Sequence, residues 1–205
     1  MLPIYVDFDD VLSDTTRICI KVANQMFGRN VSYEQVTSFN FQEVFNFNQH
    51  EFEDFMHAVH QPDILLSFQP IQGAIDVLSL WVERGYEVTI VTGRPTSSYA
   101  PSLEWLSIHH VPYHDFFMVD KYNRKQMDES IAVPMEDFTK MSFSFAIEDS
   151  LEMAEYLSRT MRKPVALFDK PWNRSCKVNG HITRYESWTQ IGNAFQRSMD
   201  IKAET

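Results

Sequence analysis

Side chains that could carry out chemistry follow short apolar segments at four places in the sequence. These places are Asp7-Phe8-Asp9-Asp10, Thr92-Gly93-Arg94, Asp120-Lys121 and Glu148-Asp149. In an open sheet of parallel strands, ligands bind beyond the carboxyl ends of the strands. If each apolar segment is such a strand, carboxylates, a hydroxyl group and cationic side chains meet at one edge of the sheet. Taken singly, each residue also fits a structural explanation as a turn residue, a helix cap or a solvated loop residue.

The chemistry that this combination supports is metal-assisted phosphoryl transfer. If the first strand ends at Asp7, that residue presents its side chain, while Asp9 offers a backbone carbonyl and turns its carboxyl group toward a substrate. Glu148 and Asp149 supply further oxygens. Carboxylates, a carbonyl and water together suit Mg²⁺, which prefers hard oxygen ligands. The ion would offset the repulsion between an anionic nucleophile and an anionic phosphate.

The segments between these residues alternate between strand and helix patterns. Apolar strands are expected at 3–8, 86–91, 116–119, 143–147 and 165–168, and helices near 74–84, 101–108, 136–141 and 150–161. This alternation predicts an α/β fold with a Rossmann-like, doubly wound parallel sheet that is covered by helices on both faces. Near the C-terminus, Val178-Asn179-Gly180-His181 predicts a hairpin turn.

The composition restricts the kind of partner. The chain has 205 residues with a formal charge of −10 and contains 6 glycines. The six glycines do not form a glycine-rich phosphate-binding loop. The negative net charge argues against nucleic acid polymers and membranes as partners. We expect neither an export signal nor a membrane-spanning segment, and Cys19 and Cys176 form no paired motif. A cytoplasmic protein with reduced cysteines is therefore expected.

A phenylalanine-rich segment follows the first strand and interrupts the α/β pattern. Its aromatic side chains include Phe39, Phe41, Phe45 and Phe47. An aromatic face in a pocket could stack on a nucleobase, although a small helical unit also needs large side chains to bury enough area. We expect the packing role for most of them, and a substrate-facing role for Phe39 and Phe41.

The four polar segments resemble the motifs of the haloacid dehalogenase-like phosphohydrolase superfamily. Asp7-Phe8-Asp9-Asp10-Val11 is similar to the first motif, DxDx(T/V), and Thr92 to the second. A lysine upstream of the last acidic strand resembles the third motif, and Glu148-Asp149 the fourth. Within the superfamily, the likeness is greatest to the 5′(3′)-deoxyribonucleotidase-like group, through Val11-Leu12-Ser13-Asp14 and the tail 165–174. The resemblance implies a core of residues 1–14 and 71–205, with residues 15–70 as a small helical cap inserted after the first strand.

The resemblance also implies roles for the acidic residues. Asp7 would be the nucleophile that takes the phosphoryl group, and Asp9 would protonate the leaving oxygen and then activate water. Asp149, together with Glu148, would complete the Mg²⁺ shell begun by Asp7 and Asp9. Two departures from the usual pattern are present, since Asp10 stands where glycine is more usual and the fourth motif is Glu-Asp where Asp-Asp is common.

Phosphate binding would fall to the second and third motifs. Thr92 and Gly93 would hold the phosphoryl oxygens together with a lysine. Arg94 would add a charge-assisted contact to the substrate, or pair with a surface carboxylate. Lys121 is the preferred motif lysine because it follows a predicted strand. The alternatives are Lys125 and Lys140.

The function implied by this resemblance is that of a Mg²⁺-dependent phosphomonoesterase that acts through an aspartyl phosphate. Its partner would be a small phosphorylated metabolite, with (deoxy)nucleoside monophosphates as the expected substrates of a 5′-nucleotidase. Two alternatives stay open, namely the same chemistry on another small phosphate ester such as a sugar phosphate, and a non-catalytic binding protein on the same fold. The sequence determines neither the base and sugar preference nor the oligomeric state, and it is compatible with a homo-oligomer.

Overall fold

A seven-stranded parallel sheet forms the centre of the protein. The computed structural model describes residues 2–121, 128–178 and 180–203. In these residues the strand order is β4-β3-β2-β1-β5-β6-β7, and every neighbouring pair is parallel. The strands are β1 (Ile4–Asp7), β2 (Val88–Thr92), β3 (Asp115–Val119), β4 (Ala132–Val133), β5 (Phe145–Glu148), β6 (Val165–Phe168) and β7 (Ile182–Tyr185). The chain runs outward in one direction from β1 to β4 and in the other from β5 to β7. The predicted doubly wound parallel fold is confirmed.

Helices cover both faces of the sheet because the strands alternate apolar side chains between two cores. In β1, Ile4 and Val6 join one core, while Tyr5 joins the other. The first core is closed by α5 (Ala74–Glu83), α6 (Tyr99–Ile108) and α9 (Trp188–Ala203). The second is closed by α7 (Met135–Lys140) and α8 (Leu151–Glu155), which a π-helical turn, Tyr156–Thr160, continues. None of the helices in the described part of the chain combines the length and the apolar character needed to cross a membrane.

The C-terminal part differs from the sequence-based expectation. The hairpin predicted at residues 178–181 is wrong, because β7 pairs in parallel with β6, with Val165 opposite Ile182. Residue 179 itself lies outside the described residues. A turn signal reports a local reversal of the chain, whereas the partner of β7 is selected by long-range burial. The two-residue strand β4 and helix α9 were also not predicted from the sequence.

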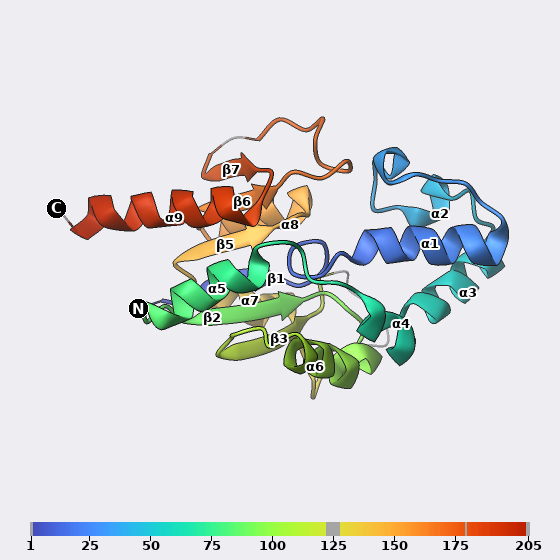
Figure 1. The fold of residues 1–205 in the computed structure, drawn as a ribbon, viewed down its shortest axis with the longest axis horizontal. Coiled ribbons are helices and arrows are strands. Elements are labelled where there is room, and N and C mark those ends of the chain that lie inside the picture. The colour runs from blue at the N-terminus through green and yellow to red at the C-terminus, as the bar shows by residue number, and fades with distance from the viewer. Residues whose placement is uncertain (1, 122–127, 179, 204–205) are drawn as a thin grey trace.

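Most of residues 15–70, called here the helical insertion, pack around a hydrophobic cluster of their own, while Leu65 and Phe68 at the end of the insertion join the first core of the sheet. Their helices are α1 (Thr15–Phe27), α2 (Phe41–Val44), α3 (Gln49–Val59) and α4 (Pro62–Ser67), with a 3₁₀ turn at Tyr33–Gln35. Figure 1 shows α1, α2 and α3 set apart from the sheet, on the side to which β2 points. The chain leaves and re-enters the core side by side, since Ile71 N–H donates to Leu12 O at 2.7 Å and Asp14 N–H to Gln69 O at 2.8 Å. The division into a core and a cap stays a prediction.

The phenylalanine cluster should decide whether the helical insertion folds. Phe55 is fully buried and its ring lies 5.2 Å from that of Phe47 and 5.8 Å from that of Phe45. We expect Phe55→Ala to lower the free energy of unfolding by about 3–5 kcal/mol, measured by urea unfolding followed by circular dichroism. Met26→Ala, at an exposed position of α1, should change it by no more than about 0.5 kcal/mol. Equal effects of the two substitutions would contradict this account of the core.

Candidate functional site

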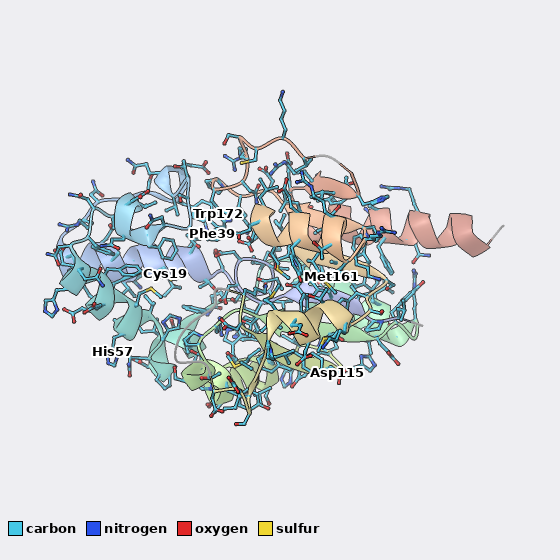
Figure 2. The ribbon with its side chains drawn as sticks, turned by 180° about the vertical axis from the view of Figure 1, so that it is seen from behind. Cys19, Phe39, His57, Asp115, Met161 and Trp172 are labelled. Atoms are coloured by element: carbon cyan, nitrogen blue, oxygen red, sulfur yellow. The ribbon has the colours of Figure 1, made fainter. Side chains whose placement is uncertain are left out.

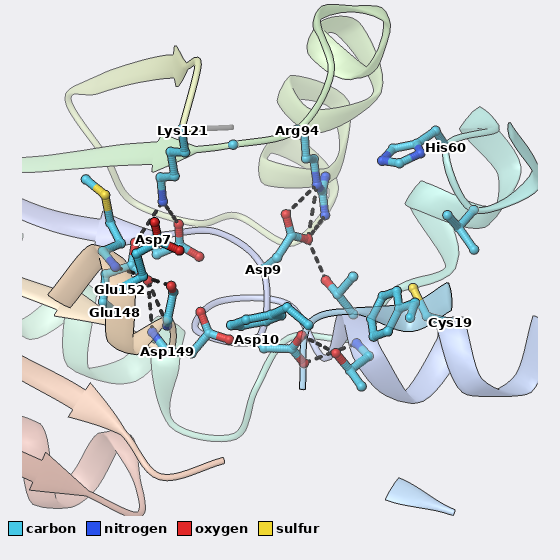
Figure 3. Close-up of a pocket in the computed structure, with 18 of the residues that line it drawn as sticks. Asp7, Asp9, Asp10, Cys19, His60, Arg94, Lys121, Glu148, Asp149 and Glu152 are labelled. Atoms are coloured by element: carbon cyan, nitrogen blue, oxygen red, sulfur yellow. Dashed lines mark hydrogen bonds and ion pairs between the residues drawn. The ribbon is translucent and has the colours of Figure 1, made fainter. Parts of the chain in front are cut away.

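Three carboxylates meet where β1 and β5 end. Asp7 is the last residue of β1, Glu148 is the last residue of β5, and Asp149 follows it. The two strands are paired, with Val6 opposite Ile147, so their next residues lie side by side. One oxygen from each of the three carboxylates lies within 4.8 Å of the others, and all three residues are buried. We call Asp7, Glu148 and Asp149 the acidic cluster, and Figure 3 shows it together with its cationic neighbour.

That cationic neighbour is Lys121, two residues beyond the end of β3. Its Nζ donates to Asp7 Oδ1 and, at 2.7 Å, to Glu148 Oε1, and its side chain is 7% exposed. Glu148 is held further by the Tyr5 hydroxyl, which donates to Oε1 at 2.7 Å, and by the N–H groups of Asp149 and Ser150, which donate to Oε2. Lys121 therefore supplies one positive charge to a cluster of three carboxyl groups.

Burial of this cluster disfavours its negative charges. It raises the pKa of the Asp7 carboxyl well above its usual range, and the charge of Glu148 raises it further, against the opposing effect of Lys121. The pKa of Asp149 is also raised, by burial first and then by the charges of Glu148 and Asp7. A divalent cation would relieve this excess charge, and clustered carboxylate oxygens are the donors that Mg²⁺ prefers. The acidic cluster therefore fits a magnesium site.

Asp9 lies in a different electrostatic environment because Arg94 holds it. Arg94 Nε donates to the two carboxylate oxygens at 3.1 and 3.0 Å and Nη2 donates to Oδ1 at 2.7 Å, while the Thr15 hydroxyl donates to Oδ1 at 2.6 Å. The guanidinium group is 4.0 Å from the centre of the Phe8 ring, and its Nη1 donates to the Ser102 hydroxyl. Burial by itself would raise the pKa of Asp9, but Arg94 and Thr15 outweigh it and hold that pKa below its usual range. Arg94 thus pairs with a site carboxylate.

The turn after β2 presents Gly93 and Arg94 to the same cavity. Thr92 is fully buried, and its hydroxyl accepts the N–H of Arg94 at 3.1 Å. Gly93 and Arg94 are among the described residues that line the cavity. Thr92 therefore fixes the shape of the turn in this structure, and the backbone and side chain of the next two residues face the ligand space.

Asp10 has a backbone conformation that suits glycine, and a side chain that has a structural role. Its φ is +57°, in the left-handed region that glycine enters most easily. Its carboxylate accepts the backbone N–H of Thr16 at 3.1 Å and the Thr16 hydroxyl at 2.6 Å. Burial raises the pKa of Asp10 to about 6, against the effect of Lys170 and of these hydrogen bonds. Asp10 thereby ties the loop after β1 to the start of the helical insertion.

The acidic cluster, Asp9 and Arg94 line a cavity of about 540 Å³ whose opposite wall comes from the helical insertion. Phe39 and Phe41 both line it, and they are joined by the apolar side chains of Phe52, Met56, Val59 and Leu65. His60 also lines the cavity and points toward Arg94 (Figure 3). Phe45 and Phe47 are buried within the insertion itself, which agrees with the packing role.

The lysines that the sequence suggested for the third motif lie in different places. Lys121 reaches the acidic cluster, whereas Lys140 is exposed and pairs with Glu136 and Asp137 on the surface of α7. Lys125 lies outside the described residues.

Tyr5 and Trp172 are among the contributors to the site that the sequence reasoning missed. Tyr5 is two residues before Asp7 in a strand and therefore shares its face, so period-two alternation could have indicated it. Trp172, whose indole N–H donates to Asp149 at 3.0 Å, is distant in sequence and gave no local signal for this contact.

Asp7 ends the central strand β1 of this parallel α/β sheet, Lys121 follows β3, and the pair Glu148-Asp149 stands at the end of β5, an arrangement that fits a haloacid dehalogenase-like hydrolase. Residues 1–199 match the family model described as 5′ nucleotidase, deoxy (Pyrimidine), cytosolic type C protein, and the chain belongs to this family. It is accordingly a phosphoric monoester hydrolase of the nucleotidase type.

Relatives and solved structures agree with this family. A Halalkalibacterium halodurans protein described as a candidate nucleotidase is 21% identical over 185 residues, which cover 90% of this chain and 88% of the relative. The crystal structure of a predicted phosphatase from Clostridium acetobutylicum superposes with a TM-score of 0.67 at 11% identity, over 96% of this chain and 99% of that one. A HAD-hydrolase from Bacillus subtilis, bound to magnesium, gives a TM-score of 0.56 at 13% identity, over 95% and 98% of the two chains. The two structural likenesses concern the fold.

The raised pKa values predict how stability depends on pH. The pKa values of Asp7 and Asp149 are higher in the folded protein than in the unfolded chain. At pH values between the unfolded-state pKa and the folded-state pKa, the metal-free folded protein therefore binds more protons than the unfolded chain. This contribution to the free energy of unfolding is full at low pH and is lost as the pH rises through the raised pKa values. Mg²⁺ competes with these protons, so we expect the increase in Tm on adding Mg²⁺, relative to a chelator, to grow as the pH is raised from acid to neutral.

The control for this measurement is Asp149→Asn, which removes one carboxylate of the acidic cluster. Its Tm should respond less to Mg²⁺ at every pH. An increase in Tm that is independent of pH, or that is larger at acid pH, would contradict the assignment of a cation to this cluster.

Proposed function

We propose that this protein is a Mg²⁺-dependent 5′-nucleotidase that hydrolyses (deoxy)nucleoside monophosphates through a phosphorylated Asp7. The observation that carries the proposal is the position of Asp7, which lies between Lys121 and two further carboxylates and opens on a cavity with an aromatic opposite wall. The family description, which names a deoxy (pyrimidine) 5′ nucleotidase, supports both the reaction and the substrate class.

The residues that would hold Mg²⁺ are Asp7 and Asp149, with Glu148 beside them and the backbone carbonyl of Asp9. When bound there, the ion would neutralise charge on the phosphate and on its attacking carboxylate. The magnesium bound to the Bacillus subtilis HAD-hydrolase, which shares this fold, supports the choice of metal. Lys121 contributes a positive charge that contacts both Asp7 and Glu148, and it would meet the phosphoryl oxygens beside Asp7.

In the first step, a carboxylate oxygen of Asp7 attacks the phosphorus atom and the bond from phosphorus to the ester oxygen breaks. The leaving oxygen takes a proton from Asp9 and departs as the nucleoside. Gly93 and Arg94 line the cavity beside Asp9 and would bind phosphoryl oxygens. A phosphate that draws Arg94 away from Asp9 would remove the contact that lowers the pKa of Asp9 and would let it carry the required proton.

In the second step, Asp9 accepts a proton from a water molecule while the water oxygen attacks the phosphorus atom. The bond between phosphorus and Asp7 breaks, so that inorganic phosphate leaves and both carboxyl groups return to their starting forms. The position of Asp9, two residues after Asp7 and lining the same cavity, supports this dual use as acid and then as base.

The helical insertion would act as a cap over the leaving group. Phe39, Phe41 and Phe52 line the cavity on this side and offer aromatic faces to a nucleobase. The same apolar wall would exclude water from the reacting phosphate. The description of the family as cytosolic and the acidic charge of the chain support a cytoplasmic enzyme that acts on small metabolites and not on nucleic acid polymers or membranes.

Replacement of the two aspartates should separate their roles. We expect Asp7→Asn to lower kcat by at least about 10⁴-fold, because it removes the nucleophile, and Asp9→Asn to lower it by about 10²- to 10⁴-fold, because it removes the general acid and base. The measurement is release of inorganic phosphate from thymidine monophosphate in the presence of Mg²⁺. Asp137→Asn, on the surface of α7, should retain the activity of the parent protein. Full activity of Asp7→Asn would show that the nucleophile lies elsewhere.

A panel of substrates tests the leaving group. We expect kcat/KM for thymidine and deoxyuridine monophosphate to exceed that for glucose 6-phosphate by about ten- to a hundredfold, because a sugar phosphate offers no base to the aromatic wall. A preference for the sugar phosphate would keep the chemistry and overturn the nucleotidase assignment. Absence of Mg²⁺-stimulated turnover across the panel would instead favour a binding protein on this fold.

A further inference from the structure

Trp172 contacts both the acidic cluster and the helical insertion. It lies in the loop after β6, and it is 8% exposed. Although it belongs to the core part of the chain, its ring packs in the hydrophobic cluster of the insertion. Figure 2 shows Trp172 beside Phe39, which the insertion contributes from a distant part of the sequence.

On one side, the loop of Trp172 holds Asp149 at two points. The indole N–H donates to Asp149 Oδ2 at 3.0 Å. The neighbouring Asn173 is fully buried, and its side-chain N–H groups donate to the backbone carbonyls of Asp149 at 2.7 Å and Phe168 at 2.8 Å. Asn173 therefore fixes the backbone of Asp149, and Trp172 fixes the direction of its carboxylate.

On the other side, the ring of Trp172 meets two aromatic residues of the insertion. Its centre lies 5.3 Å from that of Phe39, with the planes inclined at 48°, and 5.9 Å from that of Tyr33, with an edge-to-face angle of 72°. An indole ring is rigid, so a displacement of Phe39 or Tyr33 would turn the ring and the direction of its N–H together.

We propose that Trp172 is a positioning residue that couples the seating of the helical insertion to the metal affinity of the acidic cluster. The inference rests on the proposed function in taking that cluster as the Mg²⁺ site. When the insertion is packed against Trp172, the aromatic contacts orient the indole ring. Its N–H then donates to Asp149 and holds the carboxylate in one orientation. Because coupling between two binding events is reciprocal, Mg²⁺ in turn favours the seated insertion.

The test is a double-mutant cycle on Mg²⁺ affinity, measured by isothermal titration calorimetry without substrate. Trp172→Phe keeps a ring for Phe39 but removes the N–H, and we expect it to weaken Mg²⁺ binding by about 10- to 100-fold. Phe39→Ala removes the contact on the insertion side and should weaken it by about two- to tenfold. In the Trp172→Phe background, Phe39→Ala should have no further effect, because the connection to Asp149 is already broken.

The matched control is Phe27→Leu, which alters the same hydrophobic cluster at its contact with Phe47, 4.9 Å between ring centres, and should leave Mg²⁺ affinity unchanged. Phe39 is 45% exposed, so Phe39→Ala keeps the test available even if Trp172→Phe does not fold. Independent, additive losses, or unchanged affinity in both single variants, would overturn the coupling while leaving the proposed function intact. A parent protein that binds no Mg²⁺ would overturn both.

Discussion

Parallel pairing of β1 with β5 places carboxylates side by side in a buried position, and the rest of the site is arranged around the cost of that placement. An unpaired buried charge is strongly destabilising, while a buried pair is tolerated when its remaining hydrogen-bonding capacity is satisfied. Lys121 supplies the pair, and Tyr5 and two backbone N–H groups satisfy Glu148. The negative charge that is left over is the reason for proposing a cation site at this edge of the sheet.

Asp7 at the end of β1 and Asp9 in the loop that follows lie in opposite electrostatic environments. Burial and the neighbouring carboxylates raise the pKa of Asp7, whereas the guanidinium group of Arg94 is hydrogen-bonded to Asp9 and lowers its pKa. Separation of the pKa values of two neighbouring carboxyl groups is the usual basis for different catalytic roles on one site. Here the separation comes from burial and the charge of Glu148 at the end of β5, which raise the pKa of Asp7 despite Lys121, and from Arg94 after β2, which lowers the pKa of Asp9. It therefore depends on the order of strands in the sheet.

The sheet and the gathering of its polar residues could be predicted because both follow from local patterns. Apolar segments that end in Asp7, Thr92 or Glu148 indicate buried parallel strands, and such strands bring their ends to one edge. What could not be predicted depends on contacts between distant residues. The parallel partner of β7 and the bond from Trp172 to Asp149 both join segments whose sequences carry no mark of one another.

The paired backbone segments at the base of the helical insertion have a consequence for how such an enzyme can diversify. Because Leu12 and Ile71 are hydrogen-bonded neighbours, the two ends of the helical insertion lie side by side. The insertion therefore starts and ends at almost the same point of the core. The ends of a replacement unit would need to span only this short gap, and lengthening a loop between fixed ends costs little entropy. The helical insertion can therefore be exchanged during evolution while the sheet, with its carboxylates, is inherited unchanged.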